Sequence, residues 1–152
     1  MEKAQTPPLT LVQQRALLEK LLRQQAAQAK QFPMSAGQQG LWHAFRRNPG
    51  QTEFNVFLPT RIRGPLHAES LRQSIQLVAS RHAALRTTFS DSSGQLLQIV
   101  HDQLEPEFLL VPMLGASEDS LRQELDQEMR RPFDLEKGPL LRIVVYQLAA
   151  DD

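Results

Sequence analysis

The stretch LRTTFSDSSGQLLQIVH, residues 85–101, carries the clearest structural pattern in this chain. Residues 85–90 and 95–101 are rich in β-branched, aromatic and other apolar side chains. Between them lies Asp91-Ser92-Ser93-Gly94, a run of residue types that favour tight turns. Two such runs joined by a short turn predict a β-hairpin.

Segments on both sides of the hairpin alternate between helical and extended patterns. Leu71, Ile75 and Val78 recur at helical spacing and predict a helix over 68–82. The other predicted elements are helices that begin after Ser35 and Ser117 and strands over 54–63, 107–111 and 140–148. We therefore expect an α+β fold, in which a mixed β-sheet carries helices packed on one face as a two-layer sandwich.

The helix after Ser35 has a clear start signal. Ser35 and Gln38 form a capping box, in which each side chain binds a main-chain amide of the first turn. Leu41 and Trp42 give this helix an apolar face, and we interpret Trp42 as a core residue.

Residues 1–31 differ from the rest of the chain. Residues 1–8 end in two prolines and are expected to be disordered, whereas 10–30 contain mostly good helix formers. Leu11, Leu18 and Leu22 share one stripe of this predicted helix. We expect 1–31 to be a helical linker or docking appendage and 32–152 to form the folded lobe.

Composition indicates a soluble globular protein of 152 residues, 41% hydrophobic and 22% charged. With 17 basic and 17 acidic residues the net charge is zero, which argues against a nucleic-acid-binding protein. There is no cysteine, no apolar run of membrane-spanning length and no apolar core of a secretory signal near Met1. We expect a cytoplasmic protein that binds neither membranes nor nucleic acid.

Known catalytic patterns are absent from the sequence. It contains no Gly-rich phosphate loop, no GxSxG and no metal-ligand spacing among its histidines, so no metal site is predicted. We interpret His82, four residues after Val78, as a packed core residue. Asp134, in the corner Pro132–Leu135, is interpreted as a turn carboxylate that accepts main-chain amides.

Three blocks of sequence resemble the N-terminal lobe of the condensation domain of nonribosomal peptide synthetases. SAGQQGLW (35–42) is similar to the family's first core motif, S-x-A-Q-x-R-L/M-W/Y. RHAALRTTF (81–89) is similar to the second, R-H-E-x-L-R-T-x-F, and PFDLEKGPLLR (132–142) to a later segment, P-F-D-L-x-x-G-P-L-L-R. The chain departs from these patterns at Gly37, Gly40 and Ala83, and the loss of Arg at position 40 removes any contact that the family makes there.

The resemblance implies a chloramphenicol-acetyltransferase-like fold and amide-bond formation between two carrier-bound substrates. Each substrate rides on the phosphopantetheine arm of a carrier protein, and no cofactor is bound by the domain itself. The family's catalytic motif, H-H-x-x-x-D-G, normally follows the strand over 140–148 after a turn and one further strand. The 152 residues do not contain it, so no catalytic residue is assigned and the chain is expected to be an inactive fragment.

The matched residues then support the missing active site. Arg81 and Arg86 are expected to hold the motif's Asp, or else to pair with Asp134 within this lobe; His82 belongs to the same group. Expected partners are carrier proteins and the C-terminal lobe of the same domain. Self-association is also expected, through the exposed edge of 140–148 or by exchange of the helix over 10–30.

Two other interpretations remain open from the sequence. The chain could be a non-catalytic docking module that binds an upstream synthase through the helix over 10–30. It could also be another member of the chloramphenicol-acetyltransferase-like superfamily, such as a free-standing acyltransferase. The donor chain and the acceptor amino acid are not readable from these residues.

Overall fold

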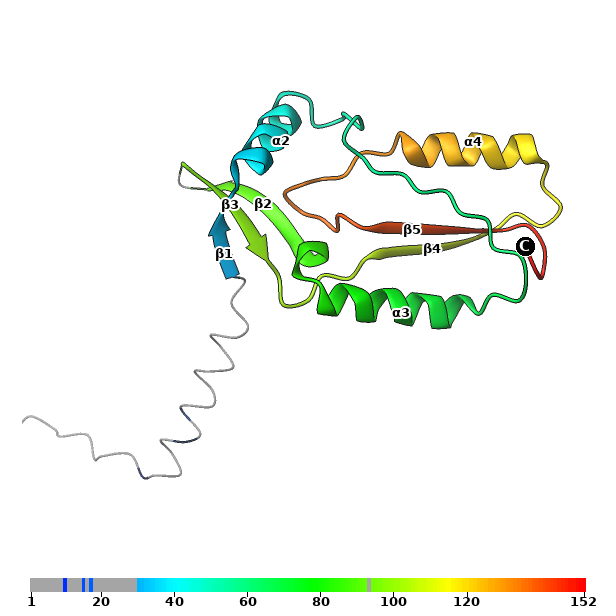
Figure 1. Ribbon diagram of the computed structural model, residues 1–152, viewed down its shortest axis with the longest axis horizontal. Helices are drawn as coiled ribbons and strands as arrows, with labels where there is room; N and C mark the ends of the chain where they lie inside the picture. The colour runs from blue at the N-terminus through cyan, green and yellow to red at the C-terminus, as the bar shows by residue number, and fades with distance from the viewer. Residues whose placement is uncertain (1–9, 11–14, 16, 18–29, 93) are drawn as a thin grey trace, which may run out of the picture.

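The computed structural model describes residues 10, 15, 17, 30–92 and 94–152. These form two small sheets and three α-helices (Figure 1). In chain order the elements are β1 (Lys30–Pro33), α2 (Ala36–Arg47), α3 (Ala68–Arg81), the 3-10 helix η1 (Ala83–Arg86), β2 (Thr87–Ser92), β3 (Gln95–Val100), β4 (Glu107–Pro112), α4 (Glu118–Met129) and β5 (Arg142–Gln147).

The predicted hairpin is confirmed as β2 and β3, which pair antiparallel from Thr87 opposite Val100 to Ser92 opposite Gln95. A strand that the sequence analysis missed, β1, pairs with the other edge of β3. This strand crosses the boundary that the sequence analysis expected between the appendage over 1–31 and the lobe over 32–152. Proline is tolerated here because it stands at the end of a strand on the edge of the sheet.

The second sheet consists of β4 and β5, which run parallel with Glu107 opposite Arg142. The α+β class is confirmed, but the strands of the described residues form two hydrogen-bonded sheets and not one mixed sheet. One reason lies at β2, where the Phe89 N–H donates to Leu135 O at 2.8 Å. The loop that contains Leu135 therefore occupies the edge of β2 to which a further strand would otherwise bond.

The strand predicted over 54–63 is wrong. Residues 55–63, which we name the strap, take a stretched path in Figure 1 but belong to no strand. Their β-branched residues favour an extended chain, yet a strand also requires a hydrogen-bonded neighbour. No described residue supplies one.

The predicted helices are confirmed with small shifts at their ends. Ser35 begins α2 with the expected capping box, and Ser117 begins α4 by accepting from the Ser120 amide. The helix predicted over 10–30 lies largely outside the described residues, as do Leu11, Leu18 and Leu22. Its predicted last residue, Lys30, belongs to β1 instead.

The buried residues in the described part of the chain are few: Met34, Trp42, Ala79, Thr87 and Thr88. Trp42 is 1% exposed, which confirms its assignment to the core. By contrast, Val56 and Leu58 on the strap are 83% and 81% exposed. No described helix is long and apolar enough to cross a membrane.

Candidate functional site

The loop over 132–141 brings the three sequence blocks together. Arg46 of α2 pairs with Glu136 of this loop at 3.1 Å and lies over the Trp42 ring at 5.9 Å. The same loop meets the second block through the Phe89–Leu135 hydrogen bond. A Cβ added to Gly138 would approach Thr88 Cγ2 at 3.0 Å, so the loop packs closely against β2.

The first block anchors α2 on the antiparallel sheet. Ser35 N donates to Gln38 Oε1 at 2.8 Å, and Gln38 N donates back to Ser35 Oγ at 3.3 Å. Gln38 Nε2 also donates to Gln98 Oε1 of β3 at 3.2 Å. Leu41, expected on the apolar face, is 45% exposed.

The Arg86 side chain joins the end of α3 to the residues that follow β3. Its guanidinium donates to the carbonyls of Ala79 at 2.9 Å and Ser80 at 3.2 Å, near the C-terminal end of α3. It also donates to His101 O and, at 3.1 Å, to Asp102 O after β3. The last carbonyls of a helix lack intrahelical partners, so Arg86 satisfies that helix end and ties it to β3. The ion pair proposed between Arg86 and Asp134 is wrong.

Arg81 and His82 differ from Arg86 in their surroundings. Both side chains are exposed, and neither forms a side-chain hydrogen bond or ion pair with a described residue. The core interpretation of His82 is wrong because α3 ends at Arg81. His82 therefore caps the helix instead of continuing its apolar face.

Asp134 closes the turn that the sequence indicated. Its Oδ1 accepts from Glu136 N at 3.0 Å and Lys137 N at 3.1 Å, and Lys137 Nζ lies 3.2 Å from its Oδ2. Burial acts to raise the pKa of Asp134, but the hydrogen bonds from Lys137 and Glu136 outweigh it and hold that pKa below its usual value. The turn interpretation is confirmed.

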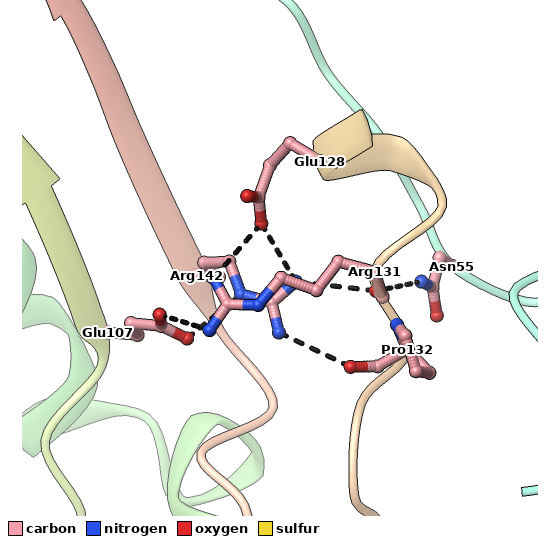
Figure 2. A network of polar contacts seen from close by, with 6 residues as sticks. All are labelled: Asn55, Glu107, Glu128, Arg131, Pro132 and Arg142. Atoms are coloured by element: carbon pink, nitrogen blue, oxygen red, sulfur yellow. Dashed lines mark hydrogen bonds and ion pairs between the residues drawn. The ribbon is translucent and has the colours of Figure 1, made fainter. Parts of the chain in front are cut away.

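A polar network that the sequence analysis missed lies where β4 and β5 begin (Figure 2). Arg142, only 9% exposed, donates through Nε to Glu107 Oε2 at 2.9 Å, and its Nη1 lies 2.9 Å from Glu128 Oε1. Its guanidinium also lies 4.4 Å from the centre of the Phe133 ring. The sequence carries one signal for this site, because Arg142 is the only charged residue in the apolar run over 140–148.

The same network reaches the strap. Arg131 Nη2 donates to the second Glu107 oxygen at 2.6 Å, and Asn55 Nδ2 donates to Arg131 O at 3.2 Å (Figure 2). Burial acts to raise the pKa of Glu107, but the hydrogen bonds from Arg142 and Arg131 lower it below its usual value. The ion pairs thus join β4, β5 and the end of α4, and the hydrogen bond from Asn55 connects them to the first residue of the strap.

A cavity of about 800 Å³ lies between the strap and the β4–β5 sheet. Its walls are largely apolar and include Leu58, Leu121, Leu125 and Val144. Asn55, Glu128, Arg142 and Tyr146 add polar groups to its lining. The pKa of the Tyr146 hydroxyl is raised, first by burial and then by the carboxylates of Glu128 and Glu124.

His67 and His101 make contacts that stabilise the fold. His67 caps α3 by accepting from Ser70 N at 3.4 Å, and His101 Nε2 lies 2.7 Å from Thr88 Oγ1. Within the described ranges, no three His, Asp or Glu residues are placed to hold a metal ion. The site therefore consists of a supporting framework and an open cavity.

The comparisons with known proteins agree on one family. A family model named "Condensation domain" matches residues 28–152. A linear gramicidin synthase of Brevibacillus parabrevis is 34% identical over 125 residues, which are 80% of this chain and 2% of that protein. Phosphinothricin tripeptide synthetase PhsC of Streptomyces viridochromogenes is 34% identical over an alignment of 170 residues, covering 100% of this chain and 16% of that protein.

Two solved structures share the fold of this chain and come from the same kind of protein. The four-domain nonribosomal peptide synthetase holo-AB3403, bound to AMP and glycine, superposes with a TM-score of 0.74 at 21% identity, over 80% of this chain and 9% of that one. The starter condensation domain of rhizomide synthetase RzmA gives a TM-score of 0.73 at 19% identity, over 80% of this chain and 31% of that one. The chain thus spans a small part of each of these proteins.

Proposed function

Because the chain belongs to the condensation-domain family of nonribosomal peptide synthetases, we propose that it forms the N-terminal part of a domain that joins two carrier-bound substrates through an amide bond. In this reaction the amine of the acceptor attacks the thioester carbon of the donor. The C–N bond forms, the C–S bond breaks, and the amine proton passes to the departing phosphopantetheine thiol.

One observation carries this proposal: the family match covers residues 28–152, and inside it the loop of the third block contacts both β2 of the second block and α2, the helix that the first block begins. Arg46–Glu136, Phe89–Leu135 and the close approach of Gly138 to Thr88 join them. Blocks far apart in sequence that meet in space are expected of a framework that supports a neighbouring site.

The supporting roles divide between the two arginines. The Arg86 guanidinium is occupied by four carbonyl oxygens, which suits a purely structural role. Arg81 is exposed and its side chain is unpaired within the described part of the chain. It is therefore the better candidate to bind the Asp of the H-H-x-x-x-D-G motif, which the 152 residues do not contain. A guanidinium binds a carboxylate with two parallel hydrogen bonds.

The test uses donor and acceptor carrier proteins loaded with thioester substrates. We expect no amide product from the 152-residue chain alone, because its residues do not include the H-H-x-x-x-D-G motif. We expect product when the same residues are part of a complete synthetase, and loss of product when Arg81 is replaced by Ala there. Turnover by the isolated chain would contradict the proposal.

A second function, docking of an upstream synthase by residues 10–30, rests on the sequence of that segment alone. It is compatible with the first, because the family match begins at residue 28. Binding of the upstream synthase that is lost on removal of residues 1–27, with the lobe still folded, would support it.

A further inference from the structure

Two large apolar side chains lie exposed near the point where the chain enters the lobe. Phe32 of β1 is 47% exposed and Leu41 of α2 is 45% exposed. Single exposed apolar residues are common on protein surfaces and need no partner. A pair that shares one surface is different, so the question is whether Phe32 and Leu41 are neighbours.

Contacts of the first sequence block place the two side chains on one face. Phe32 stands opposite Gln98 in the β1–β3 ladder, and residues opposite each other in a ladder point to the same face of the sheet. Gln38 Nε2 donates to Gln98 Oε1 at 3.2 Å, so α2 lies over that face. Leu41 follows Gln38 by three residues, which makes them neighbours on the helix surface.

The opposite flank of α2 is already occupied. Arg46 pairs with Glu136 at 3.1 Å, and the loop that holds Glu136 bonds to β2. At about 100° of rotation per residue, Leu41 lies about 140° around the helix from Arg46. The β2 edge and the β1 edge are the two sides of this sheet (Figure 1). Leu41 therefore faces the β1 side, where Phe32 lies.

The surface of α2 beside Leu41 carries two glycines. A Cβ added to Gly37 or Gly40 would have no atom of the described residues within 4 Å. Glycine is disfavoured inside a helix relative to alanine, and packing among the described residues does not require it at either position. Small residues allow a second helix to approach closely, so the two glycines agree with a covered surface.

The chain that leads into β1 is within reach of this surface. Residues 10–29 end at Lys30, the first residue of β1, and Phe32 is only two residues further, or about 7 Å along the strand. Arg15 and Leu17, which the structure describes within this segment, are both helical. A helix of about 20 residues is about 30 Å long, which is longer than the 12 residues of α2.

The side-chain pattern of residues 10–29 suits an apolar seat. The predicted helix carries one stripe of large apolar residues: Leu11, Leu18 and Leu22. Its last turns carry small residues: Ala26, Ala27 and Ala29. An isolated helix of this length is marginal in water and gains most of its stability by packing an apolar stripe. The segment thus needs a surface, and the one nearest to its attachment point is apolar and uncharged.

We propose that residues 10–29 fold back on their own lobe as a helix, and that the stripe of Leu11, Leu18 and Leu22 packs on the surface formed by Phe32, Gly37 and Leu41. The occupant of this surface is therefore a segment of the same chain. The stripe is then covered within the molecule and is not available to an upstream synthase. This inference does not rest on the proposed amide-forming reaction.

The experiment measures hydrogen exchange of the Leu18 and Leu22 amides by NMR, on dilute monomeric samples of the 152-residue chain. A peptide of residues 1–29 is the reference for an undocked segment. Exchange slows where a helix is held by packing. We expect both amides to exchange at least about tenfold more slowly in the chain than in the peptide.

A pair of double variants locates the seat. Phe32→Gln with Leu41→Gln changes two exposed side chains without adding charge, and it should return the exchange of the Leu18 amide to the rate in the peptide. The matched control is Leu77→Gln with Val78→Gln, a similarly exposed apolar pair on α3, at 52% and 47%. The control should leave that exchange unchanged. The amides of β3 should stay protected in both, which shows that the lobe remains folded.

A single variant tests the glycine surface. Gly37→Gln introduces a better helix former into open space, so it should not destabilise α2 if the surface is bare. If the segment packs there, the new side chain should speed exchange of the Leu18 amide at least about threefold.

Three results would overturn the proposal. Equal exchange in the chain and the peptide would show that the segment does not pack on the lobe. Loss of protection in the α3 control, or none in the Phe32 and Leu41 variant, would place the seat elsewhere. Protection that rises with protein concentration would assign the surface to a second copy of the chain.

Discussion

Arg142 and Glu107 stand opposite each other at the first position of the β4–β5 ladder, with Arg142 Nε 2.9 Å from Glu107 Oε2. The pair does more than join two strands. Arg142 also lies 2.9 Å from Glu128 at the end of α4 and donates to the carbonyls of Arg131 and Pro132. Because the Arg142 side chain is only 9% exposed, these contacts are shielded from water.

Replacement of Arg142 should therefore be strongly destabilising. We expect Arg142→Gln to lower the free energy of unfolding by about 3 kcal/mol, since it leaves two carboxylates partly buried with fewer partners. Arg142→Lys should recover only part of this loss, because an ammonium group cannot reproduce the forked contacts of a guanidinium. Urea denaturation of the variants measures both effects.

The control for this prediction is Arg122→Gln. Arg122 is 75% exposed and its ion pair with Asp119 is 3.7 Å long. Its loss should change stability by less than about 0.5 kcal/mol. Equal effects at positions 122 and 142 would show that the network contributes no more than surface charges do.

Stability should fall in acid, and Glu107 should account for part of the fall. The pKa of Glu107 is lower in the folded protein than its ordinary value, so its ionised form favours folding. This stabilisation is complete above the unfolded-state pKa of about 4.3 and is lost as the pH falls through the lower folded-state value. Unfolding followed from pH 7 to pH 2 should show a weaker pH dependence for Glu107→Gln. An unchanged slope would contradict the assignment.

Gly138→Ala should destabilise the loop that joins the three blocks. Gly138 has a φ of +63°, where an alanine costs about 1 kcal/mol. Its new Cβ would also lie 3.0 Å from Thr88 Cγ2 and 3.1 Å from Leu104 Cδ2, so we expect a total loss of about 2 kcal/mol. Gly115→Ala is the matched control, because Gly115 has a φ of +73° with no atom near its Cβ position. Similar melting temperatures for the two variants would show that packing at 138 is loose.

Replacing Arg86 should destabilise the 152-residue chain much more than replacing Arg81. Arg86→Ala removes hydrogen bonds to four carbonyls and should cost about 2 kcal/mol. Arg81→Ala changes an exposed side chain and should lie within about 0.5 kcal/mol of the parent. Thermal unfolding of both variants decides this, and a large loss at Arg81 would mean that it has a partner within the lobe.

Removal of residues 1–27 should leave a folded lobe, because β1 begins at Lys30. Removal of 1–33 should not, since it deletes β1 and exposes the edge of β3. Circular dichroism and solubility of the two shortened chains test this boundary. If the first deletion unfolds the protein, the N-terminal segment is part of the core and not an appendage.

Local sequence signals determined most of the elements. The Ser35 and Ser117 caps, the Asp134 turn and the hairpin of β2 and β3 all depend on residues close in sequence, whose side chains bond to nearby main chain. The three sequence blocks likewise pointed to the family that the comparisons identify. Such features are readable because their physics involves only a few neighbouring residues.

Tertiary structure decided the rest. Residues 54–63 have the composition of a strand but lack a hydrogen-bonded neighbour among the described residues, and residues 30–33 form a strand only because β3 offers an edge. The roles of Arg86 and Arg142 follow from carbonyls and carboxylates that lie far away in sequence. A strand needs a partner and a buried charge needs a counter-charge, and which residues supply them is set by how distant segments meet.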